Sequence, residues 1–142
     1  MRFWDTSALI PLFIAERETS RAERWLREDS EVAVWMLTRV ELLSALARRR
    51  REEPVARPGL LAARRGLLAA WEHWSEVTAV EEARGHAERI VEAHPLRAAD
   101  ALQIAAALVV AAGQPRTVTF VTLDRRQAAA AAVEGLDVLG PA

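Results

Sequence analysis

Short apolar segments that alternate with helical patterns constrain the fold of this chain more than any other feature. The segments lack strict polar alternation, as strands do when helices cover both faces of their sheet. The strand candidates are Arg2–Trp4, Val32–Trp35, Val77–Val80, Val118–Thr122 and Leu136–Leu139. Between them, apolar residues recur at helical spacing. This order predicts an α/β fold in three layers, with a five-stranded parallel sheet between two layers of helices.

Proline and glycine mark the predicted ends of helices. The segment Glu52–Gly59 is the one predicted linker, and it joins two helices into an inserted helical hairpin. His94 precedes Pro95, and a residue before proline avoids the helical region, so one helix ends there. Gly113 and Gly135 follow helical patterns and are plausible helix stops.

Composition excludes several classes of protein. The chain has 142 residues and a formal net charge of −1, so we expect a single domain over 1–142 without a generally basic surface. It has no cysteine, which excludes disulfides, thiolate metal sites and cysteine nucleophiles. All 19 basic residues are arginine, so no mechanism can use a lysine. The start is not a signal peptide and no apolar run could span a membrane, which predicts a cytoplasmic protein without membrane association.

Four carboxylates occur in the opening turns of predicted helices, and three of these helices directly follow an apolar segment. In a parallel sheet the carboxyl end of a strand meets the amino end of the next helix, and ligands bind there. If the first and fourth strands are neighbours, the acids that follow them converge at one edge of the sheet. The four residues are Asp5, Glu41, Asp100 and Asp124.

Carboxylates that converge favour a bound cation. Two such charges about 4 Å apart repel by about 4 kcal/mol at an effective dielectric near 20. They therefore raise one another's pKa values or recruit a cation. Oxygen ligands without histidine or cysteine select Mg²⁺ or Mn²⁺ rather than Zn²⁺. Ser7 and Thr122 could add hydroxyl contacts to a ligand or a metal-bound water, and Arg97 could contact a phosphate at the cleft.

Each acid alone also has a structural interpretation, which the sequence leaves open. Asp5 and Asp124 fit helix N-cap positions. Thr38-x-x-Glu41 fits a capping box, in which Glu41 reaches back to a backbone N–H. Asp100, one turn into its helix, would complement the helix dipole.

Other catalytic signatures are absent from the sequence. There is no Gly-x-x-x-x-Gly-Lys, Gly-x-Gly-x-x-Gly or Gly-x-Ser-x-Gly motif. Phosphoacceptor receiver domains share acidic strand ends, but they need a lysine. His73, His86 and His94 lie outside the acidic segments and at no metal-ligand spacing, so solvated or capping roles are expected for them.

The acidic segments resemble those of PIN-domain nucleases, and more closely those of the VapC-type toxins of bacterial and archaeal toxin–antitoxin pairs. Their order and spacing agree over essentially the whole chain. The matching segments are Asp5-Thr6-Ser7-Ala8-Leu9, Glu41 after Thr38, Leu96-Arg97-Ala98-Ala99-Asp100-Ala101-Leu102-Gln103-Ile104-Ala105, and Val121-Thr122-Leu123-Asp124.

This resemblance implies a PIN fold and an endoribonuclease that depends on Mg²⁺ or Mn²⁺. It implies that the four acids are catalytic and bind the metal, with Asp5 and Asp100 as direct ligands. Asp124 lacks the aromatic residue that often follows in the family, which favours a role through water. The resemblance also implies a homodimer, an RNA substrate, and a VapB-type antitoxin whose tail fills the active-site groove.

Two surface features have more than one interpretation. Segment 39–65 has eight arginines against three glutamates, and this local excess of +5 could follow a phosphate backbone, bind an acidic antitoxin tail, or be solvated. Leu67, Leu68, Trp71 and Trp74 form one helical stripe, for which core packing is expected.

Two other functions compete with a toxin ribonuclease. The first is a non-catalytic PIN-like binding module whose acids only cap helices. The second is a PIN nuclease that cleaves DNA or processes RNA without a toxin role, because the same ions promote cleavage of either backbone.

Overall fold

A five-stranded parallel sheet forms the middle layer of the computed structural model, which describes residues 1–141. The spatial order is β3-β2-β1-β4-β5, and every neighbouring pair is parallel. The first and fourth strands are therefore neighbours, as the convergence of the acids requires. The strands are β1 (Arg2–Trp4), β2 (Val32–Trp35), β3 (Ser75–Val77), β4 (Thr119–Val121) and β5 (Asp137–Leu139).

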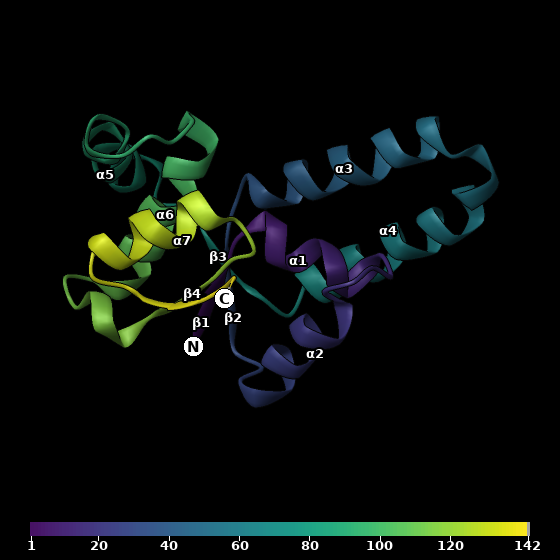
Figure 1. Cartoon of the computed structure of the whole chain (residues 1–142), viewed down its shortest axis with the longest axis horizontal. Coiled ribbons are helices and arrows are strands. Elements are labelled where there is room, and N and C mark those ends of the chain that lie inside the picture. The colour runs from purple at the N-terminus through teal and green to yellow at the C-terminus, as the bar shows by residue number, and fades with distance from the viewer. Residues whose placement is uncertain (142) are drawn as a thin grey trace.

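Helices cover both faces of this sheet, which confirms the predicted three-layer architecture. Figure 1 shows α1–α4 on one side of the strands and α5–α7 on the other, with α3 and α4 forming a long hairpin. The helices are α1 (Thr6–Phe13), α2 (Thr19–Glu28), α3 (Thr38–Glu52), α4 (Arg57–Trp71), α5 (Val80–Ala93), α6 (Ala98–Ala111) and α7 (Arg125–Val133). Within residues 1–141, no helix has the length and apolarity needed to cross a membrane.

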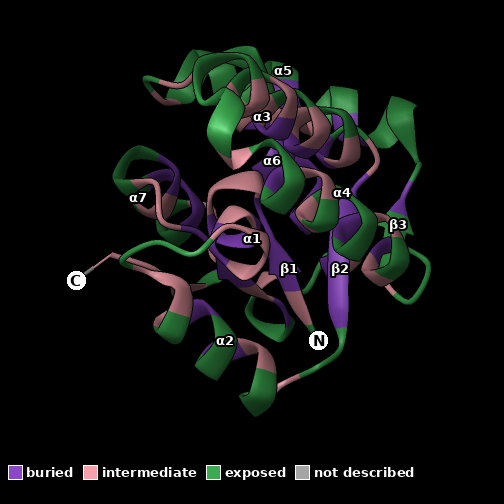
Figure 2. Cartoon of the chain, turned by 90° about the vertical axis from the view of Figure 1, so that its right-hand side faces the viewer, coloured by how far each residue is buried: buried purple, intermediate pink, exposed green. Residues whose placement is uncertain are grey.

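Successive strand residues belong to two separate cores, which explains why the strands lack polar alternation. Phe3 packs on the side of α5–α7 and stacks on Phe120, with ring centroids 5.7 Å apart. Trp4 packs on the opposite side, where its ring meets Trp25 edge-on. Both strand faces are therefore buried, as the purple ribbons of β1 and β2 in Figure 2 show.

The third strand differs from the prediction. It runs from Ser75 to Val77, whereas Val80 begins α5. This strand lies at the edge of the sheet, so Ser75 and Glu76 stay exposed and an apolar pattern does not reveal them. After Val77, the Val80 N–H donates to the Thr78 carbonyl at 2.8 Å and the chain turns into the helix. The fourth and fifth strands are correctly placed but shorter than predicted.

The predicted linker Glu52–Gly59 is also mostly ordered as helix. A 3-10 turn covers Pro54–Ala56, and α4 already begins at Arg57. Pro58 lies in the first turn of α4, where proline is tolerated because that backbone N–H has no helical partner. The hairpin prediction is confirmed, but its connection is shorter than expected.

The predicted helix stops and the aromatic core are confirmed. Gly113 and Gly135 follow α6 and α7 with φ of 83° and 94°, the left-handed region that favours glycine. His94 is the C-terminal cap of α5. In the predicted stripe, Leu67 and Trp71 are buried, while Leu68 and Trp74 are partly buried.

Candidate active site

The four predicted acids line one cavity at the carboxyl edge of the sheet. Asp5 caps α1 directly after β1, and Asp124 caps α7 shortly after β4. Glu41 and Asp100 lie in the first turns of α3 and α6. The cavity has a volume of about 210 Å³, and its lining comprises Asp5, Thr6, Ser7, Ile10, Glu41, Asp100, Gln103, Asp124 and Gln127.

Pairing between β1 and β4 places Asp5 at this edge. The Asp5 N–H donates to the Val121 carbonyl at 3.0 Å, one residue beyond the paired strands. Ser7 Oγ lies 3.3 Å from Thr122 Oγ1, and it accepts from the Leu123 N–H at 2.9 Å. These contacts hold the start of α1 against the segment that carries Asp124.

Asp5 is the most buried of the four acids, with 1% of its surface exposed. Its Oδ1 accepts from Ser7 Oγ at 2.8 Å and from the Ala8 N–H at 3.2 Å. Its Oδ2 is buried and accepts no hydrogen bond from any residue within 1–141. Burial raises the pKa of Asp5 from 3.8 to about 7, against the opposing effect of the hydrogen bonds from Ser7 and Ala8.

Glu41 and Asp100 each accept a hydrogen bond from a buried glutamine. Gln103 Nε2 donates to Glu41 Oε1 at 2.9 Å, and Gln127 Nε2 donates to Asp100 Oδ1 at 3.1 Å. Burial raises the pKa of Glu41, and the Asp100 charge adds to this effect. The pKa of Asp100 is likewise raised, first by burial and then by the Asp124 charge.

The capping interpretations hold for two acids and fail for one. Asp5 and Asp124 are N-caps; Asp124 Oδ1 accepts from the Gln127 N–H at 2.9 Å. The predicted capping box at Thr38 is wrong, because Leu37 is the N-cap of α3. The hydroxyl of Thr38 and the carboxylate of Glu41 instead both accept from the Gln103 amide.

The supporting residues predicted from the sequence have different environments. Ser7 lines the cavity. Thr122 is fully buried, outside the cavity lining, and its Oγ1 accepts from the Asp124 N–H at 3.0 Å. Arg97 lines an adjoining groove, and its charge lowers the pKa of Asp100.

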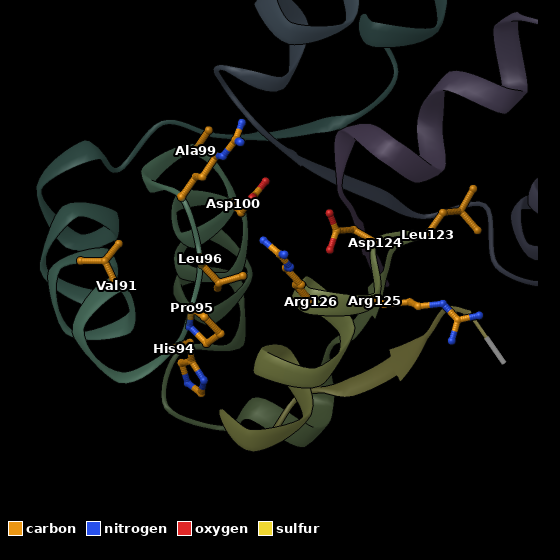
Figure 3. Close-up of a pocket in the computed structure, with 11 residues that line it drawn as sticks. Val91, His94, Pro95, Leu96, Ala99, Asp100, Leu123, Asp124, Arg125 and Arg126 are labelled. Carbon is orange, nitrogen blue, oxygen red and sulfur yellow. The ribbon is translucent and has the colours of Figure 1, made fainter.

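This adjoining groove has a volume of about 1020 Å³ and shares Asp100 and Asp124 with the acidic cavity. Arg97, Arg125 and Arg126 contribute positive charge to its lining. In Figure 3 the guanidinium of Arg126 extends between Asp100 and Asp124, whereas that of Arg125 points away from them. The groove therefore places cationic side chains directly beside the acidic cavity.

The other predicted surface features lie apart from the site. The arginines of segment 39–65 contribute to neither cavity lining. Arg49 instead pairs with Glu16 at 3.3 Å, and Arg39 lies over the Trp71 ring. His94 lines the groove and is the C-cap of α5, one of the two roles predicted for it; its Nε2 also lies 2.8 Å from a Glu134 oxygen.

Four residues of the cavity lining were not predicted from the sequence, and two of these, the glutamines Gln103 and Gln127, contact the acids. Gln103 and Gln127 are buried, and each lies three residues after one of the acids. The recurrence of Asp-x-x-Gln in Asp100–Gln103 and Asp124–Gln127 is the signal that could have revealed them. Residues three apart share one face of a helix, so both side chains follow their acid towards the cavity.

The oxygen-only donor set of the cavity fits a hard divalent cation. Asp5 Oδ2 is a buried acceptor without a partner, and in the described part of the chain none of the four acids forms an ion pair with an arginine. Carboxylates that no arginine pairs with directly favour Mg²⁺ or Mn²⁺. As the side chains stand, no three Asp, Glu or His residues within 1–141 are grouped closely enough to hold an ion. Binding therefore requires side-chain adjustment.

Comparisons with known proteins identify the family. The family model of the PIN domain matches residues 2–133. The ribonuclease VapC47 of Mycobacterium tuberculosis is 35% identical over 130 residues, which cover 89% of this chain and 86% of VapC47. The chain therefore belongs to the PIN-domain family, and its similarity to VapC47 places it among the VapC-type members.

Solved structures share the fold at lower sequence identity. A toxin–antitoxin complex from Klebsiella pneumoniae aligns with a TM-score of 0.63 and 14% identity, over 89% of both chains. The sarcin–ricin loop cleaving toxin VapC20 of Mycobacterium tuberculosis aligns with a TM-score of 0.62 and 18% identity, over 99% of this chain and 100% of VapC20. These likenesses confirm the three-layer PIN fold.

The raised pKa of Asp5 predicts how the stability of the metal-free protein depends on pH. The folded state binds the Asp5 proton more tightly than the unfolded state, so the free energy of unfolding falls as pH rises from about 4 to about 7. The loss from Asp5 reaches up to about 4 kcal/mol. Urea unfolding in EDTA across this range measures it, and Asp5→Asn should flatten the fall and stabilise the protein at pH 7.

Asp29 provides the matched control. Its pKa is lowered, chiefly by a hydrogen bond from the N-terminal amine, so its own contribution to stability grows as pH rises. Asp29→Asn should therefore keep the fall in stability or make it steeper. An Asp5→Asn variant with the same pH dependence as the wild type would contradict the assignment to Asp5.

Proposed function

We propose that this protein is a Mg²⁺- or Mn²⁺-dependent endoribonuclease that acts as the toxin of a VapBC-type toxin–antitoxin pair. The observation that carries the proposal is one cavity at which four elements place Asp5, Glu41, Asp100 and Asp124 without arginine ion pairs. These four acids are the proposed catalytic and metal-binding residues of a single PIN domain. The 35% identity to a ribonuclease supports RNA as the substrate.

In this proposal the residues of the cavity hold the cation, and those of the groove hold the phosphate. Asp5 Oδ2 and the carboxylates of Asp100, Asp124 and Glu41 would hold the cation. Such an ion supplies Lewis-acid activation of water and neutralises charge on the phosphodiester. Asp100 and Asp124 line both the acidic cavity and the groove, so a phosphate in the groove would lie next to these two acids.

The groove provides the path for the RNA backbone. Arg97 and Arg126 lie beside Asp100, close enough that their charges lower its pKa. Arginine contacts to phosphate position a nucleic acid without reading its sequence. This arrangement favours the groove, rather than the arginine-rich segment 39–65, as the surface that holds RNA next to the acids.

An antitoxin and a second copy of the chain are the proposed protein partners. The Klebsiella pneumoniae protein of the same fold is solved as a toxin–antitoxin complex, which supports a VapB-type antitoxin as the neutralising partner. We propose that its tail enters the groove beside Asp100 and Asp124 and excludes RNA. A homodimer remains the proposed assembly of the toxin itself.

A non-catalytic binding module is the competing function, and the N-cap hydrogen bonds of Asp5 and Asp124 favour it. The two functions differ in what Asp100→Asn does to the metal-free protein. If Asp100 only complements the dipole of α6, the variant loses about 1 kcal/mol. If it belongs to a repelling cluster, the variant melts at a higher temperature in EDTA.

Cleavage of a mixed pool of tRNA, rRNA and mRNA tests the nuclease directly. We expect cutting in Mg²⁺ and none in EDTA, and Asp100→Asn should lower the rate by at least about 10-fold, because losing a metal ligand costs no less than losing an outer-shell partner. Asp137→Asn, at an exposed position of β5, is the matched control and should cut like the wild type. A folded wild-type protein that cuts no RNA in Mg²⁺ or Mn²⁺ would contradict the proposal.

Salt dependence tests the path of the RNA. Arg97→Gln and Arg126→Gln should each raise KM and reduce the slope of log binding affinity against log salt by about 1, because each removes one phosphate contact. Arg51→Gln, an exposed arginine at the end of α3, should leave both quantities unchanged. The reverse pattern would assign the RNA to the hairpin instead of the groove.

A further inference from the structure

Two buried glutamines connect the helices that carry the acids. Gln103 is 1% exposed and Gln127 is 4% exposed, although glutamine side chains are mostly exposed in proteins. Each lies three residues after the acid at the start of its own helix: Gln103 after Asp100 in α6, and Gln127 after Asp124 in α7. Each donates its amide to an acid on a different element.

Gln103 joins α6 to two other helices. Its Nε2 lies 2.9 Å from Glu41 Oε1 and 2.8 Å from Thr38 Oγ1, both in α3. The same nitrogen lies 3.1 Å from Thr6 Oγ1 at the start of α1. An amide nitrogen has only two hydrogens, so three acceptors compete for them. The charged Glu41 oxygen is the strongest acceptor, because charge-assisted hydrogen bonds exceed neutral ones.

Gln127 makes the corresponding link from α7 to α6. Its side-chain Nε2 donates to Asp100 Oδ1 at 3.1 Å, while its backbone N–H donates to Asp124 Oδ1 at 2.9 Å. The two glutamines thereby extend a series of contacts from Asp124 through Asp100 to Glu41. This series crosses three helix starts that are distant in the sequence.

The chemistry of these donors suits carboxylates that bind a cation. A neutral amide fixes the orientation of one carboxylate oxygen and adds no positive charge of its own. An arginine in the same place would orient the carboxylate but compete with the cation for its charge. Outer-shell hydrogen bonds of this kind orient metal ligands.

The glutamines also have an unfavourable feature that packing does not explain. The Oε1 atoms of both Gln103 and Gln127 are buried and have no hydrogen-bond partner in the part of the chain that the structure describes. A buried acceptor without a partner destabilises the fold, and a methionine of similar shape would avoid this cost. The amide in each position is therefore explained by its Nε2 group, which donates to the acids.

We propose that Gln103 and Gln127 are positioning residues that orient Glu41 and Asp100 for the cation and for RNA cleavage. The inference rests on the proposed function, because it assigns the acids to a divalent cation. The residues act through the carboxylates and do not contact the substrate. They should therefore control metal affinity and turnover but not RNA binding.

Gln103→Met and Gln127→Met test this proposal in the full chain, with Mn²⁺ as the probe. Calorimetry and electron paramagnetic resonance measure Mn²⁺ binding, and a cleavage assay measures kcat and KM. Each variant should weaken Mn²⁺ binding and lower kcat by about 10–100-fold, with KM for RNA unchanged. Gln114→Met, at an exposed glutamine after α6, should match the wild type in all of these measurements.

The outcomes separate this inference from the proposed function. A wild-type protein that neither binds Mn²⁺ nor cleaves RNA overturns both. A wild-type protein that does both, with glutamine variants that match Gln114→Met, overturns only the positioning roles. A lower melting temperature with unchanged Mn²⁺ affinity also overturns them, because it shows a structural role. Where a methionine variant fails to fold, Gln103→Asn or Gln127→Asn retracts the amide by one methylene and replaces it in the same test.

Discussion

The parallel pairing of β1 with β4 is the constraint on which the site depends. It joins the first strand to one that follows more than a hundred residues later, in the register Arg2 to Thr119 and Trp4 to Val121. The hydrogen bond from the Asp5 N–H to the Val121 carbonyl continues that register into the loops. Without this pairing, the caps of α1 and α7 would have no common edge, and four scattered acids would remain four separate helix starts.

The same arrangement buries carboxylates whose ionisation does not stabilise the fold. Burial raises the pKa values of Asp5, Glu41 and Asp100, so ionising these groups opposes folding at neutral pH. Helix capping explains the position of Asp5 through its Oδ1, but it does not explain the buried, unpartnered Oδ2. A bound cation would give Oδ2 a partner, and the chain belongs to the PIN-domain family.

Most of the architecture could be predicted from the sequence, because buried parallel strands leave continuous apolar segments. The bounds of β1 and β2 were predicted correctly for this reason. An edge strand needs no such pattern, so β3 was misplaced towards Val80. The convergence of the acids followed from one assumption about strand order, which the topology confirms.

The finer features of the site depend on contacts that a sequence does not encode locally. The capping box at Thr38 failed because an amide from α6 reaches both Thr38 and Glu41. Gln103 and Gln127 were missed because their partners lie on other helices, and glutamine is usually solvated. The pKa of Asp5 depends on burial by several elements, so no motif predicts its value of about 7.

Proton release on Mg²⁺ binding tests the central claim, that these carboxylates form a cation site, most directly. Calorimetric titration of the protein in buffers of different ionisation enthalpy measures both the affinity and the number of protons released. Because the pKa of Asp5 is about 7, Mg²⁺ should displace about half a proton from Asp5 at pH 7, and Asp5→Asn should remove this release. Mg²⁺ binding that releases no proton and is unaffected by Asp5→Asn, or no binding by the folded wild type, would contradict the account.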